Sequence, residues 1–169
     1  MRLRPVEEAD LPRFVEWLAD PEVTRWLAAV GEPPTLDDEY DWWESRRADP
    51  DNVMWAIDTI DGGLIGTVDL RIVPNAARAE LGIAIQDKSQ WSRGFGTDVV
   101  RLVLEYGFEE MGLHRVELHV DEDNARAIRC YEKCGFVREG VLREHRFVDG
   151  RFTNTIQMSV LAHEWKASR

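Results

Sequence analysis

Residues 124–136 have the sequence Asn124-Ala-Arg-Ala-Ile-Arg-Cys-Tyr131-Glu-Lys-Cys-Gly-Phe136, and we predict a helix over 124–134. On a helix Asn124, Ile128 and Tyr131 are spaced i, i+4 and i+7, so they share one face. Asn at a helix start is usually a cap, and a single Tyr on such a face is usually a partly buried core residue. Taken one at a time, these residues indicate only structural roles.

Upstream lies a glycine-containing stretch, Trp91-Ser-Arg-Gly-Phe-Gly-Thr-Asp98, between a predicted strand and a long predicted helix. Gly94 and Gly96 allow a tight turn with exposed amides at a helix start, which favours an anion such as a phosphate. The P-loop is excluded because no Lys-Ser or Lys-Thr follows the glycines. The dinucleotide fingerprint is excluded because Val99 stands where its third glycine belongs. Two glycines are also compatible with an ordinary helix start.

The remaining elements follow from periodicity and turn residues. The pattern predicts strands over 2–6, 53–59, 64–73, 79–86, 114–121, 136–148 and 151–162, and helices over 8–18, 22–28, 35–46 and 94–111. Thr35 with Asp38 three residues later predicts a helix cap. There is no internal repeat or linker, so we expect one mixed α/β domain over residues 1–169.

Composition excludes several classes of protein. The net charge of the 169 residues is −11, and residues 7–51 hold 14 acidic against 4 basic residues. Nucleic-acid binding is disfavoured because it needs a basic surface, whereas a cationic partner is permitted. No apolar run is long enough for a membrane span or a signal peptide. Cys130 and Cys134 are too few for a disulfide scaffold or a thiolate zinc site, which favours the reducing cytoplasm.

Taken together, the motifs resemble the GNAT N-acetyltransferase superfamily, most closely its RimJ/RimL-like branch. The resemblance is carried by Glu80-Leu-Gly-Ile-Ala-Ile85, then Arg93-Gly-Phe-Gly96 opening a helix, then the run from Asn124 to Phe136. It is densest over 80–136 and extends more loosely over nearly the whole chain. Either half of the pattern would be weak evidence alone, but the joint pattern is specific.

The resemblance implies an α/β fold with a twisted, mostly antiparallel central sheet flanked by helices and splayed at the cofactor site. It implies that acetyl-CoA lies in this opening, with its pantetheine arm on the strand backbone of Ile83, Ala84 and Ile85. The diphosphate would lie on the amides of Arg93, Gly94, Phe95, Gly96 and Thr97, in agreement with the anion site predicted above. Asn124 would contact the pantetheine arm, and Tyr131 would lie near the thioester sulfur.

Two positions depart from the superfamily pattern. Trp91 stands where many members have Gln or Arg, although Trp is frequent there in the RimJ/RimL-like branch. Asn154 stands where related sequences often have Asp. The first departure favours the branch assignment, and the second bears on the acceptor site.

For chemistry we expect Tyr131 to act as general acid, because a phenol is protonated at neutral pH and suits a thiolate leaving group. Glu80 is the candidate base, acting through a water, although it is equally well explained as a surface carboxylate. His119 is an alternative base. A covalent route through a cysteine lacks a neighbouring base. The remaining histidines share no ligand spacing with Cys or acidic residues, so we expect no metal.

The expected acceptor is a primary amine, either a protein N-terminus or a small molecule such as a polyamine. Trp26 and Trp42 are candidate acceptor-site residues, because the N-terminal helices usually wall this site in the superfamily. Trp43 is adjacent to Trp42, and we expect only one of the two to face the core. A catalytically silent CoA-binding or partner-binding module on the same fold is the alternative. We expect a monomer or homodimer that binds neither nucleic acid nor membrane.

Overall fold

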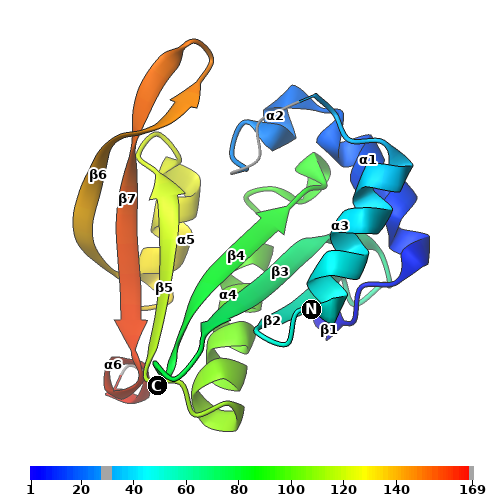
Figure 1. The fold of residues 1–169 in the computed structure, drawn as a ribbon. Coiled ribbons are helices and arrows are strands. Elements are labelled where there is room, and N and C mark those ends of the chain that lie inside the picture. The colour runs from blue at the N-terminus through cyan, green and yellow to red at the C-terminus, as the bar shows by residue number, and fades with distance from the viewer. Residues whose placement is uncertain (28–31, 168–169) are drawn as a thin grey trace. The chain divides into compact units, whose positions relative to one another are not determined.

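The computed structural model describes residues 1–27 and 32–167 (Figure 1). The strands are β1 (Arg2–Arg4), β2 (Asn52–Asp58), β3 (Leu64–Val73), β4 (Arg78–Ile85), β5 (Arg115–Asp121), β6 (Val137–Val148) and β7 (Arg151–Leu161). The α-helices are α1 (Leu11–Leu18), α2 (Pro21–Thr24), α3 (Leu36–Ala48), α4 (Phe95–Glu105), α5 (Ala125–Lys133) and α6 (Ala162–Ala167), with short helical turns η1 (Glu8–Asp10), η2 (Lys88–Gln90) and η3 (Tyr106–Glu110). The strand order is β1-β2-β3-β4-β5-β7-β6.

The chain forms two compact units, which are described separately below. The first comprises Met1–Arg71 and Gly82–Phe95, and the second comprises Ile72–Leu81 and Gly96–Arg169. Both β3 and β4 contribute residues to each unit. The expectation of one domain over 1–169 stays a prediction.

In the first unit, β1, β2 and β3 pair antiparallel, with Leu3 opposite Ile57 and Ile57 opposite Gly66. Helix α1 has one apolar face, since Leu11 and Phe14 are spaced i and i+3 and both are buried. This face forms a core cluster whose members are Val6, Leu11, Phe14, Trp17 and Ala56. Burial of a large apolar side chain contributes about 1.5–3 kcal/mol, so this cluster stabilises the packing of α1 on β2.

Helix α3 begins with the cap that the sequence predicts. The Thr35 hydroxyl accepts a hydrogen bond from the Asp38 amide at 3.2 Å, and the Asp38 carboxylate accepts one from the Thr35 amide at 2.8 Å. This reciprocal arrangement satisfies two donors at the helix start.

In the second unit, β4 and β5 pair in parallel from Arg78 opposite Arg115 to Glu80 opposite Glu117. Strand β7 pairs antiparallel with both β5 and β6. Alternation along β5 buries Val116, Leu118 and Val120, as predicted, and turns the intervening side chains to a polar face. The mixed α/β class and the mostly antiparallel sheet are confirmed.

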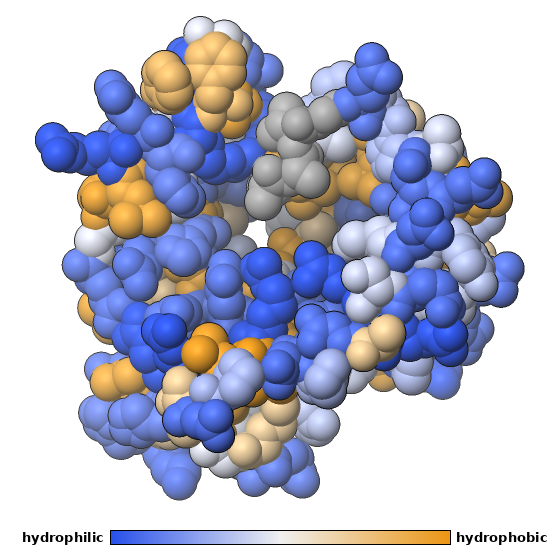
Figure 2. Space-filling view, viewed as in Figure 1, coloured by the Kyte–Doolittle hydropathy of each residue, from blue (hydrophilic) through white to orange (hydrophobic). Residues whose placement is uncertain are grey.

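The tip of the β6–β7 hairpin is apolar and exposed. Phe147 and Phe152 are opposite each other in the strand register, and their ring centroids are 5.1 Å apart. Both rings are more than half exposed, and Figure 2 shows a hydrophobic patch at this tip. The turn between the strands is Asp149-Gly150, and both residues have positive φ, as a two-residue hairpin turn of type I′ requires.

Several predicted helix boundaries differ from the structure, which also has one helix that the sequence analysis lacks. Helix α2 ends at Thr24, whereas the predicted helix ran to residue 28, which lies outside the described residues. The helix predicted over 94–111 starts one residue later and is α-helical only to Glu105, where the chain winds into the wider turn of η3. The C-terminal α6 was not predicted, because only six residues of weak periodicity form it. No helix in the described residues is long and apolar enough to cross a membrane.

Candidate active site

The expected cofactor strand is the second half of β4, in the first unit. Ile83, Ala84 and Ile85 are half-buried. Gly66 on β3 lies against this segment, because a Cβ at Gly66 would lie only 1.9 Å from the Ala84 carbonyl oxygen. Real Cβ atoms do not approach an oxygen so closely. The backbones of β3 and β4 can therefore lie this close together only with a glycine at position 66.

We expect Gly66→Ala to weaken both folding and acetyl-CoA binding. The new methyl group meets backbone rather than a flexible side chain, and such overpacking typically costs about 1–3 kcal/mol. Denaturant unfolding and acetyl-CoA titration of the variant test this. Gly140→Ala is the matched control, since a Cβ at Gly140 meets nothing within 4 Å. Equal stability and affinity in the two variants would contradict the close approach.

Trp91 fixes the end of the cofactor strand. Its indole Nε1 donates a hydrogen bond to the Ile85 carbonyl at 2.6 Å. The residue that the sequence singled out as a departure from the superfamily pattern therefore has a definite position, folded back on β4. Sequence reasoning did not find this contact, because nothing in the spacing of residues 85 and 91 specifies a side-chain to backbone bond.

The turn that follows Trp91 has an unusual backbone. Ser92 has φ +62° and Gly94 has φ +89°, and these positive values flank Arg93. Positive φ is costly for most residues but not for glycine. The Arg93 guanidinium is held by the Gln90 side-chain oxygen at 2.6 Å and lies 5.2 Å from the centre of the Phe95 ring. The turn therefore leads directly into α4, and the Arg93 guanidinium lies next to the start of this helix.

Helix α4 starts at Phe95, so the amides of its first turn have no partner within the helix. These include the amides of Gly96 and Thr97, in the second unit. Aligned amides and the helix dipole favour an anion at this position. The turn thus has the exposed amides that an anion site needs, and its binding of the diphosphate stays a prediction.

Helix α5 begins with Asn124, whose side-chain oxygen accepts a hydrogen bond from the Ala127 amide at 3.1 Å. Asn124 is thus a helix cap, and its predicted contact with the pantetheine arm stays a prediction. Tyr131 on the same helix is buried, with its ring 5.8 Å from that of Phe136. Burial, reinforced by Cys130 and Cys134, raises the pKa of the Tyr131 phenol above its ordinary value.

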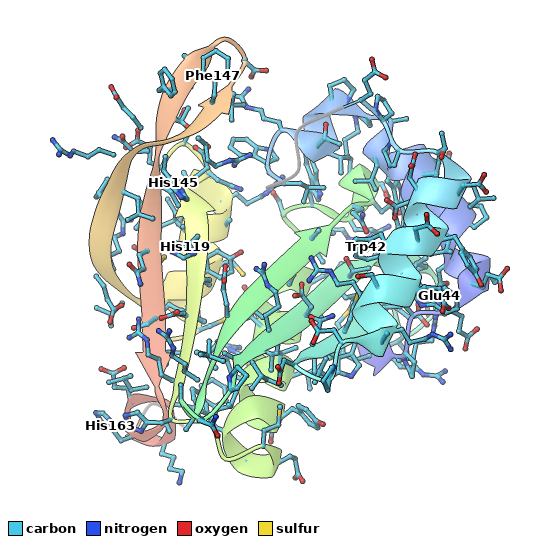
Figure 3. All side chains as sticks on the ribbon, in the orientation of Figure 1. Trp42, Glu44, His119, His145, Phe147 and His163 are labelled. Atoms are coloured by element: carbon cyan, nitrogen blue, oxygen red, sulfur yellow. The ribbon has the colours of Figure 1, made fainter. Side chains whose placement is uncertain are left out.

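Glu80 and His119 lie together on the polar face of the second unit. The Glu80 Oε1 atom is 3.3 Å from His119 Nδ1, and each side chain is about one-third exposed. The His145 ring lies 6.2 Å from the His119 ring, and its Nδ1 atom is 3.1 Å from the Thr155 hydroxyl. Figure 3 shows His119 and His145 as neighbours on this face. Glu80 and His119, which the sequence analysis gave as alternative bases, are therefore in contact with each other.

Neighbouring carboxylates on the same face are engaged by arginines. Glu117 is bound by Arg78 at 3.3 Å and by Arg115 at 2.8 Å, and Arg115 also binds Glu139. Hydrogen bonds from Arg115 and Ser159 lower the pKa of Glu139 to about 2. Arginines thus hold Glu117 and Glu139, and Glu80 contacts His119.

The aromatic residues proposed for the acceptor site lie in the first unit. Trp26 is half-buried, with the Arg25 guanidinium 5.0 Å from the centre of its ring. Trp42 packs on the α1 cluster, where its ring meets Phe14 edge to face at 6.5 Å. Trp43 packs on the same cluster and donates a hydrogen bond to the Val6 carbonyl at 3.2 Å.

The expectation that only one of Trp42 and Trp43 faces the core is therefore wrong. Adjacent helix residues diverge by about 100°, and indole rings are large enough for both to reach the same cluster from its two sides. The acceptor role of Trp42 stays a prediction, and Figure 3 shows its position on α3.

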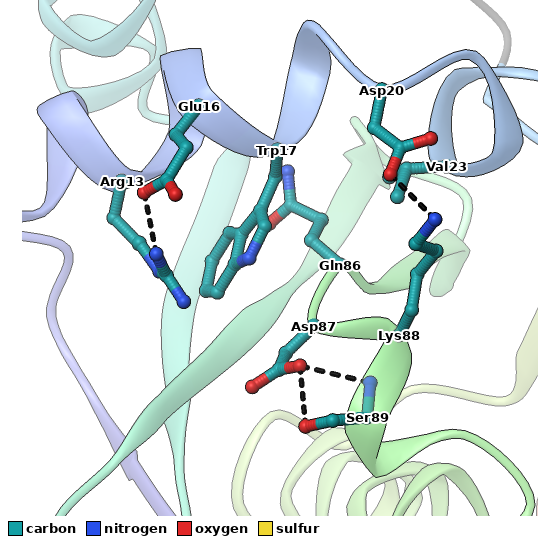
Figure 4. A pocket seen from close by; sticks show the side chains of 9 residues that line it. All are labelled: Arg13, Glu16, Trp17, Asp20, Val23, Gln86, Asp87, Lys88 and Ser89. Carbon is teal, nitrogen blue, oxygen red and sulfur yellow. Dashed lines mark hydrogen bonds and ion pairs between the residues drawn. The ribbon is translucent and has the colours of Figure 1, made fainter.

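A pocket of about 290 Å³ lies in the first unit, between α1 and the turn after β4 (Figure 4). Its lining carries both signs of charge and comprises Arg13, Glu16, Trp17, Asp20, Val23, Gln86, Asp87, Lys88 and Ser89. Lys88 Nζ lies 2.7 Å from both Asp20 and Glu22. This bridge joins the α1–α2 connection to the segment just before the Gly94 turn, and sequence reasoning did not find it because the partners are distant in the chain.

Comparison with known proteins identifies the family. A family model described as an acetyltransferase (GNAT) domain matches residues 1–137, which is most of the chain. The chain belongs to the GNAT acetyltransferase family. It is an N-acetyltransferase, and acetyl-CoA is its acetyl donor. The superfamily prediction is thus confirmed.

Curated relatives of this GNAT acetyltransferase cover almost its whole length. The spermidine N(1)-acetyltransferase of Vibrio cholerae is 30% identical over 168 residues, which are 98% of this chain and 95% of that protein. The spermidine N(1)-acetyltransferase of Escherichia coli is 33% identical over 170 residues, which are 99% and 89%. A crystal structure of the Vibrio cholerae spermidine N-acetyltransferase, in complex with CoA and spermine, matches with a TM-score of 0.89 at 28% identity, over 98% of this chain and 97% of that chain.

The GNAT acetyltransferase has no recognisable metal centre in residues 1–27 and 32–167, since no three His, Cys, Asp or Glu side chains gather there in a way that could hold an ion. Within the described residues, its candidate catalytic groups are the buried Tyr131 and the Glu80–His119 pair.

Proposed function

We propose that this acetyltransferase acts on a polyamine, transferring the acetyl group of acetyl-CoA to a primary amine of spermidine or a related molecule. The observation that carries the proposal is the match, over 98% of the chain, to a structure bound to CoA and spermine. The acidic N-terminal region supports it, because residues 7–51 carry ten more acidic than basic residues and attract a polycation.

A polyamine makes a specific demand on the site. An aliphatic amine with a pKa near that of lysine, about 10.4, is neutral in fewer than about one molecule in a thousand at pH 7. Only the neutral amine attacks a thioester. Nearby carboxylates bind the cation but also raise its pKa, so the enzyme needs a base close to the reacting nitrogen.

We assign the base to Glu80, acting through a water, with His119 as its hydrogen-bonded partner. The 3.3 Å contact between them supports the assignment, because His119 orients the carboxylate. The amine nitrogen then forms a bond to the thioester carbon while the bond from carbon to sulfur breaks. The backbone near Ile83 polarises the carbonyl oxygen.

We assign the general acid to Tyr131, which gives its proton to the departing CoA thiolate. Its raised pKa keeps the phenol protonated through the working pH range, so a proton is always available. For acetyl-CoA we propose that the strand from Ile83 to Ile85 and Asn124 bind the pantetheine arm, and that the amides from Arg93 to Thr97 bind the diphosphate. For the acceptor we propose Trp26 and Trp42.

The acceptor class is tested by thiol release from acetyl-CoA. Spermidine, spermine and putrescine are compared with peptides that carry a free N-terminus, and the products are identified by mass spectrometry. The proposal expects turnover on the polyamines and an acetylated primary amine in the product. Turnover on peptides alone would contradict the acceptor class. Saturable acetyl-CoA binding without turnover on any amine would favour the silent module.

Four finer expectations remain proposals. The RimJ/RimL-like branch rests on Trp91 and the pattern over 80–136. A cytoplasmic location rests on the two free cysteines, which suit a reducing compartment. The absence of a nucleic-acid partner rests on the acidic charge balance, and that of a membrane partner on the lack of a long apolar run. A monomer or homodimer is the fourth expectation. Gel filtration with light scattering tests the oligomeric state.

A further inference from the structure

Two thiols of α5 contact the first turn of α4. The Thr97 hydroxyl donates to Cys130 Sγ at 3.5 Å, and Cys134 Sγ donates to the Thr97 carbonyl at 3.6 Å. A Cβ at Gly96 would lie 3.4 Å from Cys130 Sγ. Cys130 is partly accessible, whereas Cys134 is buried. The Cys130 sulfur therefore lies against the backbone turn whose amides form the anion site.

The surroundings of Cys130 favour its thiolate. The neighbouring Cys134 thiol, then the hydrogen bond from Thr97, and the charges of Lys133 and Arg101 lower the pKa of Cys130 to about 7 against the opposing effect of burial. The positive end of the α4 dipole acts in the same direction. The hydrogen bond to Cys130, burial and Asp98 raise the pKa of Cys134. Cys130 is thus the more accessible of the two thiols, and its pKa is lowered whereas that of Cys134 is raised.

We propose that Cys130 is a thiol-modification site on the cofactor-binding turn, that it reacts with soft carbon electrophiles, and that bound acetyl-CoA shields it. The shielding rests on the proposed position of the CoA diphosphate, whereas the reactivity does not. In the first step the Cys130 thiol loses its proton to solvent and becomes a thiolate. The sulfur then bonds to the electrophilic carbon, and the leaving group, iodide for a haloacetamide, departs with its electron pair.

Modification also has a consequence for binding. Only 3.4 Å separates Cys130 Sγ from the position of a Cβ at Gly96, so an added group has no room between α5 and the first turn of α4. Since Cys130 is partly accessible, an adduct grows from a sulfur that lies against the proposed diphosphate turn. We therefore expect an adduct on Cys130 and bound acetyl-CoA to compete.

The test is the rate of alkylation by iodoacetamide of the native full-length protein, followed by peptide mass spectrometry between pH 6 and 9, with and without CoA. A thiol of pKa near 7 is half thiolate at pH 7, against about 3% for an ordinary one, so Cys130 should react about tenfold or more faster than Cys134. Its rate should rise with a midpoint near pH 7, and saturating CoA should slow it about tenfold or more. Equal rates at the two cysteines, or a midpoint above 8, would overturn the reactive site.

Three variants and one binding measurement separate the parts of the proposal. Cys134→Ala removes the neighbouring thiol that favours the Cys130 thiolate and should shift the midpoint of Cys130 labelling to higher pH. Arg101→Gln should shift it the same way by removing a positive charge. Cys130→Ser should abolish the loss of acetyl-CoA affinity that iodoacetamide causes. Calorimetry reports CoA binding directly. If Cys130 is labelled fast and bound CoA does not slow the labelling, the shielding is wrong. The proposed acetyltransferase function would still stand, because it does not depend on the shielding.

Discussion

Tyr131→Phe is expected to lower turnover by about 10²-fold or more while leaving acetyl-CoA affinity unchanged. The substitution removes one hydroxyl from a side chain that is 9% exposed and keeps the ring that packs on Phe136. Without the phenol, the CoA thiolate must leave unprotonated or take a proton from water. The loss therefore falls on the chemical step and not on binding.

Steady-state thiol release with spermidine, together with calorimetric titration of acetyl-CoA, measures the two effects separately. Tyr106→Phe is the matched control, because it removes the hydroxyl of an exposed tyrosine in η3. The control should keep full turnover. If Tyr131→Phe turns over within about twofold of the parent enzyme, the residue is not the general acid.

Glu80→Gln has the second large expected effect, a loss of about 10²-fold in turnover on spermidine at neutral pH. The amide cannot accept the amine proton, so the variant depends on the small fraction of acceptor that is already neutral. Its rate should therefore rise about tenfold for each pH unit until the pKa of the amine is approached. An acceptor amine with pKa near 7.8 should be affected far less, since roughly one-seventh of it is neutral at pH 7.

Glu117→Gln provides the comparison for Glu80. It removes a carboxylate from the same polar face, but one bound by Arg78 and Arg115. We expect it to change stability more than turnover. If Glu80→Gln and Glu117→Gln lose turnover equally, the loss reflects the charge of the face and Glu80 is not the base. The same conclusion follows if Glu80→Gln loses as much turnover on the weakly basic acceptor as on spermidine.

The local elements of the fold follow from the sequence because their causes are local. The helix of residues 125–133 has its cap at Asn124, and the hairpin turn has Asp149-Gly150, so neighbouring residues determine both. The turn proposed to bind an anion is equally local, since Gly94 adopts φ +89° directly before a helix start. Such features need no knowledge of distant partners.

The contacts that assemble the site are not local, and the sequence does not specify them. Glu80 meets His119 only because Glu80 is opposite Glu117 in the β4–β5 register, a pairing across about 40 residues. Cys130 meets Thr97 only through the packing of α5 on α4. Two residues can each be a candidate base in the sequence, and only the register shows that they form a pair.

The central claim is that the amides around Gly94 and Gly96 bind the CoA diphosphate and so deliver the thioester to Tyr131. The most direct measurement is a crystal structure of the protein with CoA. The account predicts diphosphate oxygens within hydrogen-bonding distance of the amides from Gly94 to Thr97, with the sulfur beside the Tyr131 hydroxyl. A diphosphate bound elsewhere, with this turn in contact only with solvent, would contradict it.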